Sequence, residues 1–188
     1  MLTIAEVQPF EVHRLDRAAY HQLSDAGAFA GKKVQLIDGV IVTINSMGPP
    51  HAFVVGKLTQ VLSLQLGDSR IIRVGLPLAL SERSEPEPDL AVVSEKDTDP
   101  GADHPSSSPL VIEVSDSSRT FDLGLKADLY AAARLPEYWV VDLKNAKIVV
   151  HLEPRKGRYQ RVHRFGRGKA VTSTIAPRVT VKVNDLFV

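Results

Sequence analysis

Apolar and polar positions near the start of the chain predict a hairpin followed by a helix. The run VQLIDGVIVTI (residues 34–44) sets two β-rich segments on either side of Asp38-Gly39. This pair favours a two-residue turn, because both central positions of such a turn need a positive φ. Apolar residues from His51 to Leu66 then recur at helical spacing. A shorter helix is predicted upstream, from Asp16 to Ser24.

Three apolar runs in the middle of the chain predict strands of a sheet. The segment from Ile71 to Leu80 alternates loosely, as a half-buried strand does. The runs DLAVV (Asp89 to Val93) and LVIEV (Leu110 to Val114) are almost uninterrupted, which is typical of central strands buried on both faces. The segment between them, EKDTDPGADHPSSS (95–108), is rich in turn-forming residues and is predicted to be an exposed loop.

One further helix and several strands are predicted in the last third of the chain. Asp122 can cap a helix that runs from Leu123 to about Arg134. The face of this helix that packs inward is predicted to carry Leu125, Leu129 and Ala132. The later strands are predicted at Tyr138–Leu143 and Lys147–Leu152, with more β structure through Val162 and at Val179–Val183. Together these elements indicate a mixed α/β (α+β) sheet protein.

The composition favours one globular domain over residues 1–188. The chain has 188 residues, of which 44% are hydrophobic, enough for one full core and too few residues for two ordinary domains. It has no cysteine, which excludes disulfides, thiolate zinc sites and cysteine nucleophiles. No apolar stretch approaches the ~18 residues of a membrane span. Glu6 and Glu11 interrupt the first segment, so no signal peptide is predicted and a cytoplasmic protein is expected.

The basic residues are unevenly distributed along the chain, although the formal net charge is only +1. One segment holds seven basic residues and no acidic one: Arg155, Lys156, Arg158, Arg161, Arg164, Arg167 and Lys169. Such a local excess can collect phosphate groups. A solvated hairpin explains the same composition and is favoured over a specific binding surface.

Each of the two central strands carries one carboxylate. Asp89 opens DLAVV directly after Pro88, and Glu113 interrupts LVIEV where an apolar residue would be expected. An ionised carboxylate in a buried strand is costly unless a cation pairs with it. If the strands are neighbours, both groups can converge at one end of the sheet. Magnesium suits such a pair, because it is commonly held by one or two carboxylates, waters and substrate phosphate oxygens.

Lys126 completes a possible reaction centre from the next helix. Its ammonium could stabilise negative charge on a phosphate during transfer, or help to lower the pKa of the attacking water. Each residue alone has a structural explanation: Asp89 can cap a turn, Glu113 can pair with an arginine, and Lys126 can be an exposed helical lysine. The three together, in this order on these elements, are more specific than any one of them.

Long stretches of the chain resemble a known family. The motifs EPDLAVV and LVIEVSDSSRTFDLGLKADLYAAARLPEYWVVD resemble the Uma-type family of restriction endonucleases, within the PD-(D/E)xK nuclease superfamily. With the hairpin and the Pro49-Pro50-His51 start of the following helix, the likeness covers residues 34 to 152. It implies a restriction-endonuclease-like central mixed sheet flanked by helices, with an N-terminal β-hairpin. It also implies a Mg²⁺-dependent endonuclease, with Mn²⁺ as a substitute, that acts on DNA as a homodimer.

The resemblance assigns roles to particular residues. Asp89 and Glu113 match the two acidic metal ligands of the superfamily motif, and Lys126 matches a lysine that this family supplies from the next helix instead of at Ser115. His51 matches a family histidine near the active site, where it would contact phosphate or water; a plain polar helix start is the alternative. Gln35 stands where the family hairpin usually has a glutamate, which removes one negative charge from the acidic cluster.

Three functions compete at this point. The first is a nuclease that hydrolyses phosphodiester bonds in DNA by a metal-activated water, favoured by Asp89, Glu113 and Lys126. The second is a weakened or inactive nuclease-fold module that binds DNA or protein, favoured by Gln35. The third is a hydrolase of a small phosphorylated substrate, against which the sequence has no glycine-rich phosphate loop.

Overall fold

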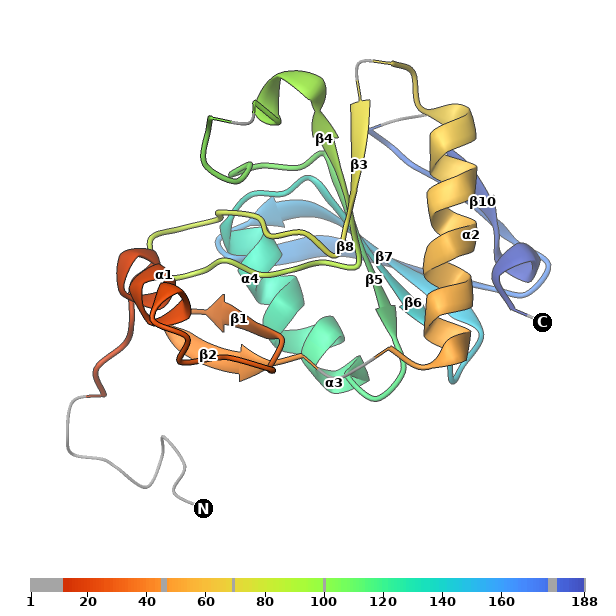
Figure 1. The fold of residues 1–188 in the computed structure, drawn as a ribbon. Coiled ribbons are helices and arrows are strands. Elements are labelled where there is room, and N and C mark those ends of the chain that lie inside the picture. Colours follow the sequence, from red (N-terminus) through yellow and green to blue (C-terminus); the bar gives the residue numbers. More distant parts are fainter. Residues whose placement is uncertain (1–11, 45–46, 69, 100, 176–178, 188) are drawn as a thin grey trace.

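A six-stranded mixed sheet forms the middle of the molecule (Figure 1). The computed structural model describes residues 12–44, 47–68, 70–99, 101–175 and 179–187. Strand order is β3-β4-β5-β6-β7-β8; β5 and β6 are parallel and the other neighbouring pairs are antiparallel. The strands are β3 (Arg70–Val74), β4 (Leu90–Ser94), β5 (Leu110–Ser115), β6 (Glu137–Asp142), β7 (Lys147–Arg155) and β8 (Arg158–Gly166).

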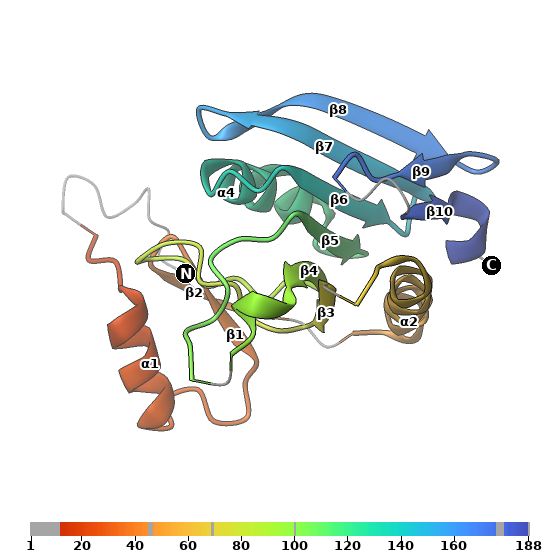
Figure 2. The same ribbon diagram turned by 90° about the horizontal axis from the view of Figure 1, so that it is seen from above.

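Helices cover both faces of this sheet (Figure 2). Because successive side chains of a strand point to opposite faces, Leu90 and Ile112 pack toward α2 (Pro49–Gln65), and Ala91 and Val111 pack on the opposite side. The opposite side is covered by one helical segment made of α3 (Arg119–Phe121), η3 (Asp122–Lys126) and α4 (Ala127–Ala132). Three short elements join the α2 side: β9 (Ala170–Thr172), β10 (Thr180–Lys182) and η4 (Val183–Leu186). The short helix η2 (Glu95–Asp97) follows β4.

The predicted N-terminal hairpin is confirmed. Strands β1 (Val34–Ile37) and β2 (Val40–Thr43) pair across a turn in which Asp38 has a φ of 46° and Gly39 a φ of 74°. Helix α1 (Arg17–Asp25) begins after Asp16, whose carboxylate caps it by accepting a hydrogen bond from the amide of Ala19. Backbone hydrogen bonds between Leu36 and Glu85 tie the hairpin to the segment that leads into β4.

Two predicted elements differ from the observed ones. The strand expected over Ile71–Leu80 ends at Val74, because Gly75 turns the chain with a φ of 59°. The helix expected from Leu123 begins instead at Arg119, so Asp122 lies inside the helical segment and is not its cap.

The buried face of that helical segment also differs from the prediction. Leu125 is 51% exposed and Ala132 is exposed, whereas Asp122 and Lys126 are buried. Asp122 and Lys126 lie four residues apart, at the two ends of the π-helical turn η3, and share the buried side of the segment. Glu113 on the sheet then compensates the buried charge of Lys126.

No helix in the described residues is long and apolar enough to cross a membrane. The basic segment that begins at Arg155 forms the end of β7 and most of β8, so the hairpin expected from its composition is present. The division of the chain into one domain stays a prediction.

Candidate active site

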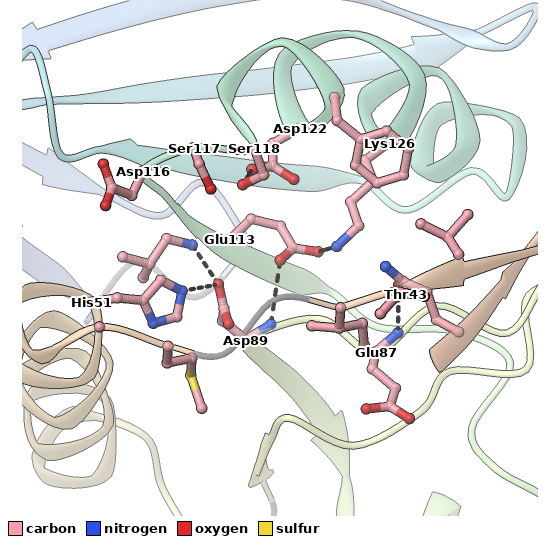
Figure 3. Close-up of a pocket in the computed structure, with 17 residues that line it drawn as sticks. Thr43, His51, Glu87, Asp89, Glu113, Asp116, Ser117, Ser118, Asp122 and Lys126 are labelled. Carbon is pink, nitrogen blue, oxygen red and sulfur yellow. Dashed lines mark hydrogen bonds and ion pairs between the residues drawn. The ribbon is translucent and has the colours of Figure 1, made fainter. Parts of the chain in front are cut away.

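A pocket of about 280 Å³ opens beside the ends of β4 and β5, where the hairpin, the start of α2 and the η3 turn meet (Figure 3). All five residues singled out from the sequence line it: Gln35, His51, Asp89, Glu113 and Lys126. The prediction that the two acidic side chains and the lysine converge on one space therefore agrees with the geometry.

The register of β4 and β5 explains why the two carboxylates meet. The antiparallel ladder pairs Leu90 with Ile112, so the next position outward sets Asp89 against Glu113. The amide of Asp89 donates a hydrogen bond of 3.4 Å to Oε2 of Glu113. Both side chains belong to the face of the sheet that the helical segment covers.

Glu113 is buried, 4% exposed, and is held by two donors. Its Oε1 accepts hydrogen bonds from Nζ of Lys126 at 2.6 Å and from the hydroxyl of Tyr130 at 2.7 Å. Burial raises the pKa of Glu113 to about 7, although the charge of Lys126 opposes that shift. For Lys126, burial acts to lower the pKa, but the carboxylates of Glu113 and Asp122 outweigh it and the pKa is raised. Lys126 is therefore a cation at neutral pH.

Asp89 is fixed through its Oδ2 atom. This oxygen accepts a 2.7 Å hydrogen bond from the amide of Val114, and Nε2 of His51 lies 3.1 Å away (Figure 3). Burial is the largest single influence and acts to lower the pKa of His51, but the hydrogen bond and charge of Asp89, together with the charge of Glu113, outweigh it, so the net pKa shift is upward. The imidazole of His51 thus acts as a charge partner for Asp89 and orients its carboxylate.

The arrangement leaves coordinating capacity on each carboxylate. These bonds use Oδ2 of Asp89 and Oε1 of Glu113, and within the described residues the other two oxygens receive only the 3.4 Å contact to Oε2. No group of three histidine, aspartate or glutamate side chains in the described part of the chain is placed to enclose an ion. Two hard oxygen donors beside an open pocket fit Mg²⁺, which keeps waters and takes substrate oxygens as further ligands.

Gln35 is committed to a structural contact. It is 4% exposed, and its Oε1 accepts a 3.2 Å hydrogen bond from the amide of Glu87. The carboxylate of Glu87 itself pairs with Nζ of Lys33 at 3.1 Å. The carbonyl oxygen of Gln35, which could have coordinated an ion weakly, is thus engaged with the backbone.

Two residues of the site escaped the sequence analysis. Asp122 is 2% exposed, lines the pocket, and accepts a hydrogen bond from the hydroxyl of Ser118; burial raises its pKa. Tyr130 holds Glu113 from α4. A signal was present, because Asp122, Lys126 and Tyr130 recur every four residues and so share one side of a helix.

Comparisons with known proteins agree with this architecture. The family model Uma2, described as "Putative restriction endonuclease", matches residues 17–184. A crystal structure described as "a putative nuclease belonging to DUF820", from Anabaena variabilis ATCC 29413, resembles the chain with a TM-score of 0.63 and 14% sequence identity. The match covers 83% of this chain and 90% of that one, and at this identity the likeness concerns the fold alone. None of the curated proteins compared with the chain matches it.

Proposed function

Because this chain belongs to the Uma2 family of restriction-endonuclease-like proteins, we propose that it is a Mg²⁺-dependent endonuclease that hydrolyses phosphodiester bonds in DNA. The observation that carries the proposal is the meeting of Asp89, Glu113 and Lys126 in one pocket. Phosphodiester hydrolysis by water needs an ion, a stabilising cation and an oriented water, and it needs no covalent nucleophile.

Asp89 and Glu113 would hold the ion. Bound Mg²⁺ supplies Lewis acidity toward the phosphoryl group and lowers the pKa of a water. Lys126, which keeps its proton, stabilises the negative charge that grows on the phosphate oxygens as the bond to the leaving oxygen breaks. His51 and Tyr130 fix the two carboxylates through hydrogen bonds, so that little reorganisation is needed when substrate arrives.

The competing function is a nuclease-fold module that binds DNA or protein without cleaving it. Gln35 favours it, since a glutamate there would add a negative charge for the ion. The contact of Gln35 with the amide of Glu87 weakens this alternative, because it gives the glutamine a structural role that is compatible with activity.

Nicking of supercoiled plasmid DNA tests the proposal. With Mg²⁺ or Mn²⁺ the wild-type protein should nick, and Asp89→Asn or Glu113→Gln should lower the rate by more than about 100-fold and weaken ion binding measured by calorimetry. Glu95→Gln, which removes an equal charge at an exposed position, should leave both unchanged.

Equal, weak ion binding by the wild type and both site variants would overturn the metal-dependent mechanism. If such a protein still bound DNA, the non-catalytic module would be the better description.

A further inference from the structure

A second pocket lies on the other side of the helical segment. Its volume is about 260 Å³, and it lies between that segment and strands β7 and β8. The helical segment contributes three residues to this second pocket: Arg119, Leu123 and Ala127. Each follows directly after a residue that lines the first pocket, namely Ser118, Asp122 and Lys126. One helix therefore separates the two pockets.

The second pocket is rich in cations, and two of them have no acidic partner among the described residues. Arg119 and Lys147 both approach the buried carboxylate of Asp142, at 2.8 Å and 3.8 Å. Arg158 and Arg164 on β8 make no ion pair with any described acidic residue. Asp128, on the helix side, is the acidic residue that lines the pocket. The pocket thus presents to a ligand two guanidinium groups that no described carboxylate neutralises.

A buried neutral histidine forms part of the pocket wall. His151 is 5% exposed; its ring stacks on that of Tyr138 and lies at a tilted angle against that of Tyr159. Its Nδ1 atom has no hydrogen-bond partner among the described residues. Burial lowers the pKa of His151 to about 4; the backbone of Tyr138 opposes the shift and the charge of Arg164 adds to it. Arg164 is therefore close enough to influence this ring.

The register of the hairpin divides the basic segment into two groups. Arg164 pairs with Val149 and Val162 pairs with His151, which sets these β8 side chains on the pocket side of the sheet. Arg161 lies between Arg158 and Arg164 in sequence and is absent from the pocket lining; its guanidinium forms an ion pair with Glu153 at 2.7 Å. Two residues of the basic segment, Arg158 and Arg164, thus line the second pocket.

We propose that this second pocket binds a backbone phosphate of the same polynucleotide whose scissile phosphodiester lies in the first pocket. The inference rests on the proposed nuclease function. A helix with its side chains is roughly 10–12 Å across, which is about three times the 3.4 Å rise of one DNA strand. A strand that passes over the start of α3 would therefore bring a phosphate a few nucleotides from the cleavage position to Arg158 and Arg164.

Salt-dependent binding tests this proposal apart from cleavage. A fluorescein-labelled DNA duplex is titrated with Asp89→Asn protein without divalent ions, and anisotropy is followed over a range of KCl concentrations. Adding Arg158→Gln and Arg164→Gln should reduce the slope of log K against log[salt] by roughly 0.7 to 0.9 for each guanidinium lost. Arg161→Gln is the control for each single substitution, because it removes one positive charge from the same strand, and it should leave the slope nearly unaltered.

A second measurement locates the ligand. The imidazole resonances of His151, followed by NMR in the same protein, should shift on adding DNA, and the shift should be lost in the Arg158→Gln/Arg164→Gln variant.

The outcomes separate the two proposals. If the slope of log K against log[salt] is the same for the Arg158→Gln/Arg164→Gln variant as for Arg161→Gln, the phosphate subsite is overturned. The nuclease proposal would remain intact. A shift of His151 with inorganic pyrophosphate, without any with DNA, would overturn the phosphate subsite in favour of a small-anion site. Loss of nicking in Glu113→Gln, with the slopes behaving as expected, would support both.

Discussion

The pockets on the two sides of the helical segment differ in how their charged side chains are neutralised. On the side of the first pocket, Lys126 and Glu113 are both buried and satisfy each other at 2.6 Å. On the side of the second pocket, Arg158 and Arg164 are exposed and have no described acidic partner. A buried charged side chain must be neutralised within the chain because its desolvation is costly. An exposed charged side chain is solvated by water and is available to bind a ligand of opposite charge. The contrast indicates which charges hold the site and which attract a ligand.

The largest difference between the two sides should appear in stability. Lys126→Met leaves the Glu113 carboxylate buried without its cation, and the free energy of unfolding at pH 8 should fall by about 3–5 kcal/mol. Arg164→Met removes an exposed charge and should change it by no more than about 0.5 kcal/mol. Urea unfolding followed by circular dichroism measures both.

A double variant controls this comparison. Glu113→Gln combined with Lys126→Met removes both charges and should recover much of the stability that Lys126→Met loses. Equal effects of Lys126→Met and Arg164→Met would contradict the assignment of the ion pair as a buried, interdependent one.

The pH dependence of stability should have opposite signs on the two sides. The pKa of His151 in the folded state, about 4, is below that of an unfolded histidine. The contribution of His151 to the free energy of unfolding is therefore fully present above pH 6.5. It is lost as the pH falls toward 4, by up to about 3 kcal/mol. The pKa of Glu113 is raised to about 7 in the folded state. The contribution of Glu113 to the free energy of unfolding is therefore fully present below pH 4.5 and is lost as the pH rises through 7.

The variant His151→Phe isolates the first of these two terms. It keeps a ring between Tyr138 and Tyr159, and its free energy of unfolding should no longer carry the loss below pH 6.5. Urea titrations of both proteins between pH 7 and pH 4 give the difference. A constant difference across that range would show that the imidazole titrates alike in the folded and unfolded states.

A smaller effect is expected at Tyr130. Tyr130→Phe deletes one hydrogen bond to the Glu113 carboxylate and should reduce stability by about 1.5 kcal/mol. The pKa of Glu113 should rise further, because one donor to its ionised form is lost. Urea unfolding gives the first quantity, and NMR titration of the Glu113 side chain gives the second. Tyr159→Phe, which deletes a hydroxyl bonded to the backbone of Leu135, is a control that should leave the pKa of Glu113 unmoved.

Sequence patterns were sufficient for the parts of the site that depend on strands. Alternation along a strand fixes which face a residue takes, so the carboxylates of Asp89 and Glu113 could be expected to meet once their strands were neighbours. The Asp38-Gly39 turn was likewise determined by local conformational preference.

The helical part of the site could not be predicted as well. The phase of the helix was assigned from apolar residues, which placed Leu125 inward, whereas tertiary pairing with Glu113 buries Lys126 instead. The sequence predicts a cap at Asp122, because aspartate is common at the residue before a helix. The four-residue spacing of Asp122, Lys126 and Tyr130 places them on one side of the helix, but polar residues with this spacing are normally expected on a solvent-facing side.

The π turn η3 makes the site sensitive to chain length as well as to residue identity. Asp122 and Lys126 are spaced by a π turn, which is wider than an α-helical turn, so deleting one residue between them would change the orientation of their side chains relative to each other. The strands and both carboxylates would remain, but the amine would point elsewhere. A single-codon deletion in this turn is therefore a route by which such a fold could keep its shape and lose its chemistry, while every residue named in its motif was still present in the sequence.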